Sequence, residues 1–416
     1  MNNAILAAPP SEEYIEMVFV KPTPAQRGHN ERFVMENLHN GTFKKTEGRV
    51  GITVGRYKPV VKVLPIEEWE NTYSQKERLG YKVISTKKLG KTQFKKITGF
   101  DLIADENVRN IVKEIHGYSQ ENFTQNYTVS VENISPEMLR EGKEILDNLA
   151  DRYKEMSTAA FNNRLTDLYK AVPRRMDILS KHLAKGPSDF AEILAAEQEL
   201  YENMKNLSSG NILSDEKNIL EANGLTWRRV TDDEKNFIVK RLGSQSNRYI
   251  DAWAIDNSLT RKRFENFCLK EELTYQNKGI SLLFHGSRNE NFWRILTTGL
   301  TINPKGVVIT GKAYGNGTYF APNAIKSMGY TSCRGSKWAG GTCDYGFLGM
   351  YEVATGTRYN GALGCDSSLN WGKLQSICPG AHCTWAESAY SGFQMDEVIV
   401  YNDSQSTVKY LVKVEL

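Results

Sequence analysis

The sequence predicts a multidomain α+β protein in which three units follow one another along the chain. A small β-rich unit is expected over residues 1–86, a basic linker over 87–100, an all-α helical bundle over 101–222 and an antiparallel-sheet domain over 223–416. Two observations predict this division. Apolar residues recur about every second residue in the first unit, as in strands, every third or fourth residue in the middle unit, as in helices, and again every second residue in the last unit. The sign of the net charge changes near the same boundaries. A chain of 416 residues has room for two or three such domains.

The charge is distributed unevenly. Residues 1–100 carry 17 Lys and Arg against 10 Asp and Glu, residues 101–223 carry 14 against 22, and residues 224–416 carry 22 against 17. Because basic surfaces attract phosphate and acidic surfaces repel it, nucleic acid is expected near the two outer units rather than the middle one. Ordinary solvated faces explain the same numbers equally well.

The first unit shows strand and turn signals. Residues 14–20 and 31–38 are rich in β-branched and aromatic side chains that partly alternate with polar ones. Asn40-Gly41 is a hairpin-type turn signal. A third strand is expected over 48–55 and a helix over 66–78.

The helical unit shows start signals and one apolar face per helix. Asp105 can cap a first helix. Ser135 precedes Pro136 and Glu137, which places a cap, a proline and an acid where a helix begins. Apolar residues at three- to four-residue spacing define four faces: Val108, Ile111, Val112 and Ile115; Leu139, Gly142, Leu146, Leu149 and Tyr153; Phe161, Leu165, Leu168 and Val172; Phe190, Ile193, Leu194, Leu200, Tyr201 and Met204. Amphipathic helices in series pack as a bundle.

The last unit is rich in strands. The apolar run at 280–284 predicts a buried strand, and further strands are expected at 253–256, 306–309, 317–321, 348–354, 397–401 and 407–416. Core positions are expected at Trp227, Phe237, Ile238 and Val239. No G-x-G-x-x-G follows an early strand, so a Rossmann nucleotide site is not supported.

Groups suited to binding a flat, amide-bearing ring gather near one strand end. His285-Gly286 closes the run at 280–284, Tyr319 lies on the short strand that follows, and Ser327 and Tyr330 stand near an expected helix start. Aromatic faces can stack on a planar ring, while bare glycine backbone and a hydroxyl can bond its amide.

This stretch resembles the catalytic domain of poly(ADP-ribose) polymerases. The shared motifs, in order, are H-G-S-R, N-F, I-L-x-x-G-L, G-x-G-x-Y-F-A and K-S-x-x-Y, and far downstream residues 395–401 resemble the family's glutamate-bearing strand. The resemblance implies an ADP-ribosyltransferase that consumes NAD as a substrate, releases nicotinamide and needs no metal.

The resemblance also implies roles for individual residues. His285, Tyr319 and Glu397 match the family's catalytic triad, in which the glutamate bonds the ribose 2′-hydroxyl and stabilises an oxocarbenium-like centre. The positions that match NAD-binding ones are His285, Gly286, Ser287, Arg288, Asn291, Tyr314, Tyr319, Phe320, Ala321, Lys326, Ser327 and Tyr330.

Several of these positions have a second interpretation. Asn291 could instead cap the following helix, Tyr314 could be core, and Lys326 could be a solvated cation or steady an acidic acceptor. Asp396 is the local competitor of Glu397. Residues 303–316 match the family's donor loop, and Thr301 stands where well-known relatives carry an arginine.

The two other units resemble further parts of the same family. Residues 1–86 resemble a WGR domain, with Gly48, Arg49, Val50 and Gly51 matching, but Glu47 replaces the signature tryptophan. Arg49 is the candidate for a nucleic-acid contact, with an exposed surface arginine as the alternative. The helical unit resembles the regulatory domain that shields the NAD site until DNA binds; a purely structural bundle is the alternative. Residues 261–264 resemble the family's basic turn.

The implied partners are DNA ends or nicks and acceptor proteins, including the chain itself. No membrane partner is expected. Six cysteines are too few for a disulfide scaffold, so a reducing intracellular compartment is expected, the nucleus in a eukaryote and otherwise the cytoplasm. Cys378, His382 and Cys383 suggest zinc, but without a C-x2-C pair no metal is expected. A mono-ADP-ribosyltransferase and a catalytically weak DNA-break-binding scaffold remain the alternative functions.

Overall fold

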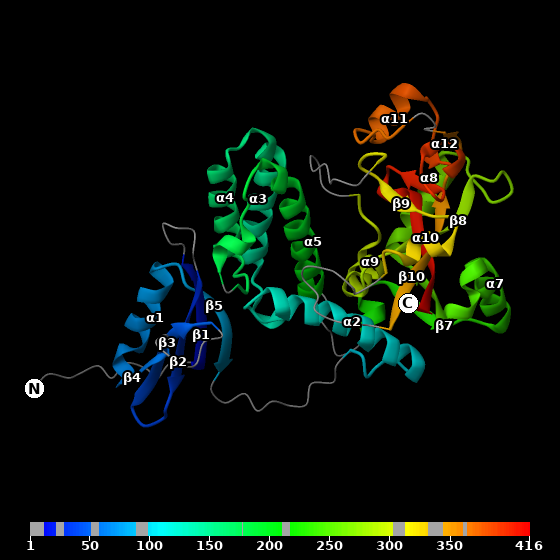
Figure 1. Ribbon diagram of the computed structural model, residues 1–416. Coiled ribbons are helices and arrows are strands. Elements are labelled where there is room, and N and C mark those ends of the chain that lie inside the picture. The colour runs from blue at the N-terminus through cyan, green and yellow to red at the C-terminus, as the bar shows by residue number, and fades with distance from the viewer. Residues whose placement is uncertain are drawn as a thin grey trace, which may run out of the picture. The chain divides into compact units, whose positions relative to one another are not determined.

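The computed structural model describes residues 12–21, 29–50, 58–88, 99–176, 178–209, 217–302, 313–331, 344–360 and 364–416 (Figure 1). The chain forms two compact units. One contains residues 1–96 with 123–208, and the other contains 97–122 with 209–416. The first unit therefore combines the β-rich segment with most of the predicted helical segment, and the domain limits given above stay a prediction.

The β-rich segment folds into a five-stranded antiparallel sheet in the order β4-β3-β2-β1-β5. Its strands are β1 (Glu12–Lys21), β2 (His29–Asn37), β3 (Thr42–Arg49), β4 (Val60–Pro65) and β5 (Lys82–Lys88). The first two expected strands are confirmed. Of the third, expected over 48–55, Gly48 and Arg49 form the end of β3, which begins directly after the Asn40-Gly41 turn; residues 51–55 lie outside the described residues.

One face of this sheet is closed by helix α1 (Trp69–Arg78), which follows a 3-10 turn at Ile66–Glu68. The alternation of the strands buries one set of apolar side chains against the helix. The core consists of Ile15, Met17, Phe33, Met35, Phe43, Trp69 and Tyr81. Gly80 ends the helical region at φ +87°, a conformation that favours glycine.

The helical segment contains α2 (Glu106–Asn126), α3 (Pro136–Arg152), α4 (Thr158–Ala171) and α5 (Phe190–Ser209). The expected caps are confirmed: Asp105 accepts a hydrogen bond from the Val108 amide at 3.1 Å, and Ser135 accepts one from the Met138 amide at 3.1 Å. These bonds satisfy amides that the first helical turn leaves unpaired.

The second compact unit contains two sheets. One has the order β6-β7-β14-β10-β8, and the other, β11-β12-β13-β9, contains one parallel pair, β11 with β12. The strands are β6 (Leu225–Arg229), β7 (Tyr249–Asn257), β8 (Ile280–Gly286), β9 (Thr318–Phe320), β10 (Tyr345–Ala354), β11 (Arg358–Tyr359), β12 (Cys383–Ala386), β13 (Glu397–Val400) and β14 (Ser406–Glu415). A bridge between Phe284 of β8 and Ala321, the residue directly after β9, joins the two sheets. The strand expected at 306–309 lies outside the described residues.

The sheets are accompanied by short helices. These are α6 (Ile219–Ala222), α7 (Asp232–Leu242), α8 (Ser258–Lys270), α9 (Phe292–Thr298), α10 (Ala324–Met328), α11 (Trp371–Ile377) and α12 (Ser388–Ser391). Two expectations were wrong here. Phe237 is 44% exposed, because α7 turns Ile238 and Leu242 to the core instead. Residues 261–264 lie inside α8 rather than in a turn.

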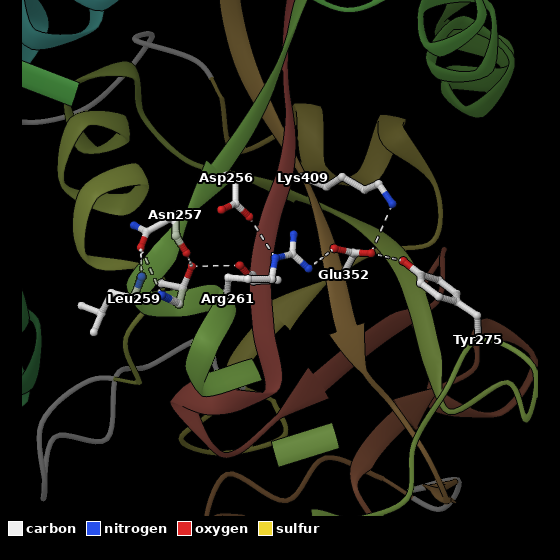
Figure 2. Close-up of polar contacts among 9 residues, drawn as sticks. Asp256, Asn257, Leu259, Arg261, Tyr275, Glu352 and Lys409 are labelled. Carbon is white, nitrogen blue, oxygen red and sulfur yellow. Dashed lines mark hydrogen bonds and ion pairs between the residues drawn. The ribbon is translucent and has the colours of Figure 1, made fainter. Parts of the chain in front are cut away.

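A buried carboxylate fastens α8 to the larger sheet. Glu352 on β10 binds Arg261 of α8 at 2.5 Å, the Tyr275 hydroxyl at 2.5 Å and Lys409 of β14 at 3.2 Å (Figure 2). Arg261 also contacts Asp256 at 2.9 Å. These charges replace the water that Glu352 loses on burial.

Within the residues just described, no helix is both long and apolar enough to cross a membrane.

Candidate active site

His285 lies at the end of β8, where the sheet meets β9. Its Nδ1 is 2.8 Å from the carbonyl oxygen of Tyr319. Because a carbonyl only accepts, Nδ1 donates and Nε2 is left with a lone pair that can accept a hydrogen bond. Burial lowers the pKa of His285 below 6.5, and the nearby Arg294 acts in the same direction, so the neutral ring is favoured.

Gly286 permits a close approach of two backbones. A Cβ at this position would lie 1.9 Å from the carbonyl oxygen of Ser327, which is far inside a van der Waals contact. Only glycine therefore lets α10 pack against the end of β8. Ser327 itself is buried. The HG pair and the K-S-x-x-Y motif are thus brought together by direct backbone contact.

Tyr319, on β9, is hydrogen-bonded to the turn that contains Tyr314. The Tyr319 hydroxyl donates to the Gly315 carbonyl at 3.1 Å and accepts from the Tyr314 amide at 3.0 Å. Burial raises the pKa of Tyr319 well above its ordinary value, and the Glu397 carboxylate adds to that effect. Tyr314 is fully buried in a cluster with Ile399 and Tyr401, so its role in packing is the one that the structure displays.

Glu397 is the first residue of β13, and the register of that strand places it beside β9. Ile399 pairs with Tyr319, and side chains two residues apart share a face, so Glu397 and Tyr319 project from the same side of the sheet. Glu397 is 8% exposed, and its Oε1 lies 2.8 Å from Nζ of Lys326. Lys326 thus pairs with this carboxylate, rather than standing as a solvated cation.

The neighbouring positions after Gly286 bond to one another. Nδ2 of Asn291 donates to the Ser287 hydroxyl at 3.1 Å, and Asn291 makes no side-chain cap for α9. Nε of Arg288 lies 3.4 Å from the buried Glu290. The capping interpretation of Asn291 is therefore wrong, and its amide instead steadies the turn after His285.

The remaining predicted positions differ in exposure. Phe320 and Ala321 are buried, and the Phe320 ring centroid lies 5.7 Å from that of His285. Tyr330 follows α10 and is 60% exposed, so its ring is accessible for stacking. Of the expected donor loop, residues 303–312 lie outside the described residues.

Tyr351 is a residue near the site that sequence reasoning missed. It is buried on β10, and its ring centroid lies 6.1 Å from that of His285 and 5.6 Å from that of Phe320. Within the described part of the chain its hydroxyl has no hydrogen-bond partner. A tyrosine in an apolar strand carries no sequence signal that separates it from ordinary core.

In the first compact unit, Glu47 is neutralised locally. It lies 2.9 Å from Lys45 and 3.3 Å from Lys76. Burial opposes ionisation, yet these two lysines lower the pKa of Glu47. Arg49 ends β3 and pairs in register with Glu31. Most of the expected basic linker lies outside the described residues.

Cys383 and His382, two of the residues that suggested zinc, make local hydrogen bonds. Cys383 is buried with its thiol 3.2 Å from the Thr355 carbonyl, and burial raises its pKa to about 12. Nδ1 of His382 accepts from the Thr357 amide at 3.0 Å. Cys333 and Cys343 lie outside the described residues.

Comparison with known proteins identifies the domain that carries this arrangement. Residues 238–416 match the model of the poly(ADP-ribose) polymerase catalytic domain, a domain of the ADP-ribosyltransferase class for which NAD is the substrate. Over these residues, which make up less than half of the chain, the protein is therefore similar to the poly(ADP-ribose) polymerase family.

Individual relatives agree with this assignment. The chain is 29% identical over 189 residues to the poly(ADP-ribose) polymerase-like protein 100L of Invertebrate iridescent virus 6, a match that covers 44% of this chain and 94% of the viral protein. It is 32% identical over 156 residues to poly(ADP-ribose) polymerase 2 of Zea mays and 31% identical over 165 residues to poly(ADP-ribose) polymerase 2 of Homo sapiens. Each of these two matches covers 32% of this chain, but only 23% of the maize protein and 26% of the human one.

Proposed function

We propose that this chain transfers ADP-ribose from NAD to protein acceptors, including itself, extends the product into a polymer and is stimulated by DNA breaks. The observation that supports the chemistry most directly is the meeting of three strand ends. β8 supplies His285, β9 supplies Tyr319 and β13 supplies Glu397; β9 pairs with β13, and Ala321, the residue directly after β9, forms a bridge with β8.

The proposed reaction breaks the bond between the nicotinamide nitrogen and ribose C1′. Nicotinamide leaves as a neutral molecule with the bonding electron pair, and an acceptor oxygen forms a new bond to C1′ as it gives up its proton. Positive charge develops on the ribose during this exchange, and a fixed carboxylate that bonds the 2′-hydroxyl stabilises it.

The residues take complementary parts in this proposal. Nε2 of His285 accepts from a ribose hydroxyl, Tyr319 and Tyr330 contact the nicotinamide ring, and Gly286 with Ser327 bonds its carboxamide. Glu397 stabilises the transition state, and Lys326 keeps that carboxylate oriented at 2.8 Å. Because positive charge develops on the ribose only as its bond to nicotinamide breaks, Glu397 is expected to affect kcat more than KM.

The DNA-dependent part of the proposal draws on the first compact unit. Asn30 of β2 donates a hydrogen bond to the carbonyl of Arg174, a buried residue that pairs with Glu197 of α5 at 3.3 Å. This contact ties the sheet that bears Arg49 to the helical segment, and it offers a physical link between DNA contact and helix packing. Arg49→Ala is expected to weaken binding to nicked DNA. The slope of the binding constant against salt concentration, on logarithmic axes, should fall by the amount that about one phosphate contact contributes.

One incubation separates the proposed function from its alternatives. The purified chain is mixed with labelled NAD, with and without nicked DNA, and both nicotinamide release and product length are measured. Faster release with nicked DNA and a ladder of long products are expected. Single additions in place of a ladder indicate mono-ADP-ribosylation, and no release under either condition indicates a binding scaffold.

The variant Glu397→Gln sharpens the same assay. Since the carboxylate is proposed to orient the acceptor hydroxyl as well, the variant should lose chain extension while retaining some single transfer. A matched change at the exposed end of β14, Glu415→Gln, should leave product length unaltered. Long chains made by Glu397→Gln would contradict the assignment of this residue.

A further inference from the structure

Asp396 and Glu397 are adjacent acids, and the structure gives them different partners. Glu397 contacts Lys326, as described above. Both carboxylate oxygens of Asp396 are engaged elsewhere. Oδ1 accepts from the Ser388 amide and from the Ser388 hydroxyl, both at 2.9 Å, and Oδ2 accepts from Nε1 of Trp385 at 3.2 Å.

These three bonds close the loop that connects β12 to β13. Trp385 lies on β12, Ser388 begins α12, and Asp396 immediately precedes β13, so both ends of the loop meet at one carboxylate. The register confirms the geometry, since Ala386 pairs with Glu397 and Trp385 pairs with Val398. A shift of the Asp396 backbone would therefore move Glu397 directly.

The closed loop also supports the cation that faces Glu397. Phe393 lies within the loop, and Nζ of Lys326 stands 5.2 Å from the centroid of its ring. The Phe393 ring packs edge-on against buried Tyr314 with centroids 5.7 Å apart. Lys326 is thus held between a carboxylate after the loop and an aromatic ring inside it.

A second aromatic contact involves Trp385, the residue whose indole bonds Asp396. The guanidinium carbon of Arg358, on β11, lies 3.5 Å from the centroid of the Trp385 ring, while the indole is nearly buried. Although burial opposes ionisation, the Ser388 and Trp385 donors and the Arg358 charge lower the pKa of Asp396. Charge-assisted bonds of this kind are stronger than neutral ones.

We propose that Asp396 is a positioning residue that fixes Glu397 and Lys326 for the transferase reaction by closing the loop between β12 and β13 through Trp385 and Ser388. This inference rests on the proposed function of Glu397. It assigns to Asp396 no contact with substrate and no proton transfer.

The test is Asp396→Asn, a change that keeps the size of the side chain. An amide offers one acceptor oxygen and two donor hydrogens. Whichever way it is turned, an N–H must face either the Trp385 indole N–H or the Ser388 amide N–H. We expect kcat for nicotinamide release to fall about tenfold, which corresponds to a small misplacement of a catalytic group, while KM for NAD changes less than twofold.

Rescue distinguishes positioning from general destabilisation. In the double variant Trp385→Phe with Asp396→Asn the indole donor is absent, so the amide can face the ring edge while its oxygen keeps both Ser388 bonds. The double variant should recover more than half of the lost kcat. Asp147→Asn, an exposed aspartate of α3, serves as the control and should match the wild type in kcat and KM.

The outcomes separate this inference from the proposed function. A wild-type chain that releases no nicotinamide overturns the proposed function, and the inference falls with it. An active wild type with an equally active Asp396→Asn variant overturns the inference alone. A loss of kcat that merely follows the folded fraction of each variant, or that the double variant does not relieve, also overturns it.

Discussion

Two buried glutamates in the same compact unit, Glu352 and Glu397, differ in the number of polar groups that bind their carboxylates. They are 6% and 8% exposed. Glu352 binds an arginine, a lysine and a tyrosine hydroxyl (Figure 2), whereas the carboxylate of Glu397, among the residues that the structure describes, forms an ion pair with Lys326 alone. A carboxylate whose lone pairs are taken by protein donors stabilises the fold, and one with remaining acceptor capacity can bind a substrate hydroxyl.

The largest effect is expected when Glu352, the carboxylate whose hydrogen bonds are all made within the protein, is neutralised. Glu352→Gln leaves Arg261 and Lys409 without their shared anion, and removing one partner of a buried ion pair costs about 3–5 kcal/mol. The free energy of unfolding, measured by chemical denaturation, should fall by that amount. At temperatures where the variant remains folded its nicotinamide release should stay within a few-fold of the wild type. A variant as stable as the wild type would contradict the structural role of Glu352.

Removing a single donor should have a smaller effect. Tyr275→Phe deletes the hydroxyl that bonds Glu352 at 2.5 Å but leaves both cations in place. A hydrogen bond to a charged group contributes about 1.5–3 kcal/mol, and part of the Tyr275 side chain is exposed, so a loss near the lower end is expected. A double-mutant cycle with Lys409→Met would show whether the two donors act together.

The pH dependence of stability offers the mildest test. Burial opposes ionisation of Glu352, but Tyr275, Arg261 and Lys409 prevail and lower its pKa below 4.5. A lowered carboxyl pKa gives stability that is present above pH 4.5 and is lost as the pH falls through the folded-state value. The denaturation midpoint of Glu352→Gln should therefore depend less on pH below 4.5 than that of the wild type. If the midpoints of the variant and the wild type fell equally with pH below 4.5, another acidic group would account for the loss of stability at low pH.

The strands that build the site could be predicted because they combine apolar runs with simple periodicity. The run at 280–284 and the alternation of 407–416 correspond to β8 and β14. Strand β4 was not predicted, because its valines show no sustained alternation with polar residues, and Val60, Val61 and Val63 all remain exposed at a sheet edge.

The choice between the adjacent acids could not be made from the residues alone. Successive side chains of a strand point to opposite faces, which says that Asp396 and Glu397 diverge but not which of them faces the site. Contacts from distant residues distinguish the two acids: Trp385 and Ser388 engage Asp396, and Lys326 faces Glu397, the acid proposed to act. Phe237 illustrates the same limit, because an aromatic residue next to core positions still faces outward on its helix.

The most direct test of the central claim is the rate of nicotinamide release at saturating NAD for the wild type, Glu397→Gln and Glu415→Gln, each normalised to its folded fraction. A preorganised group that stabilises transition-state charge contributes roughly a hundred- to a thousandfold in kcat, so Glu397→Gln should be slower by that factor with KM nearly unchanged, while Glu415→Gln equals the wild type. A Glu397→Gln variant that releases nicotinamide at the wild-type rate would contradict the account.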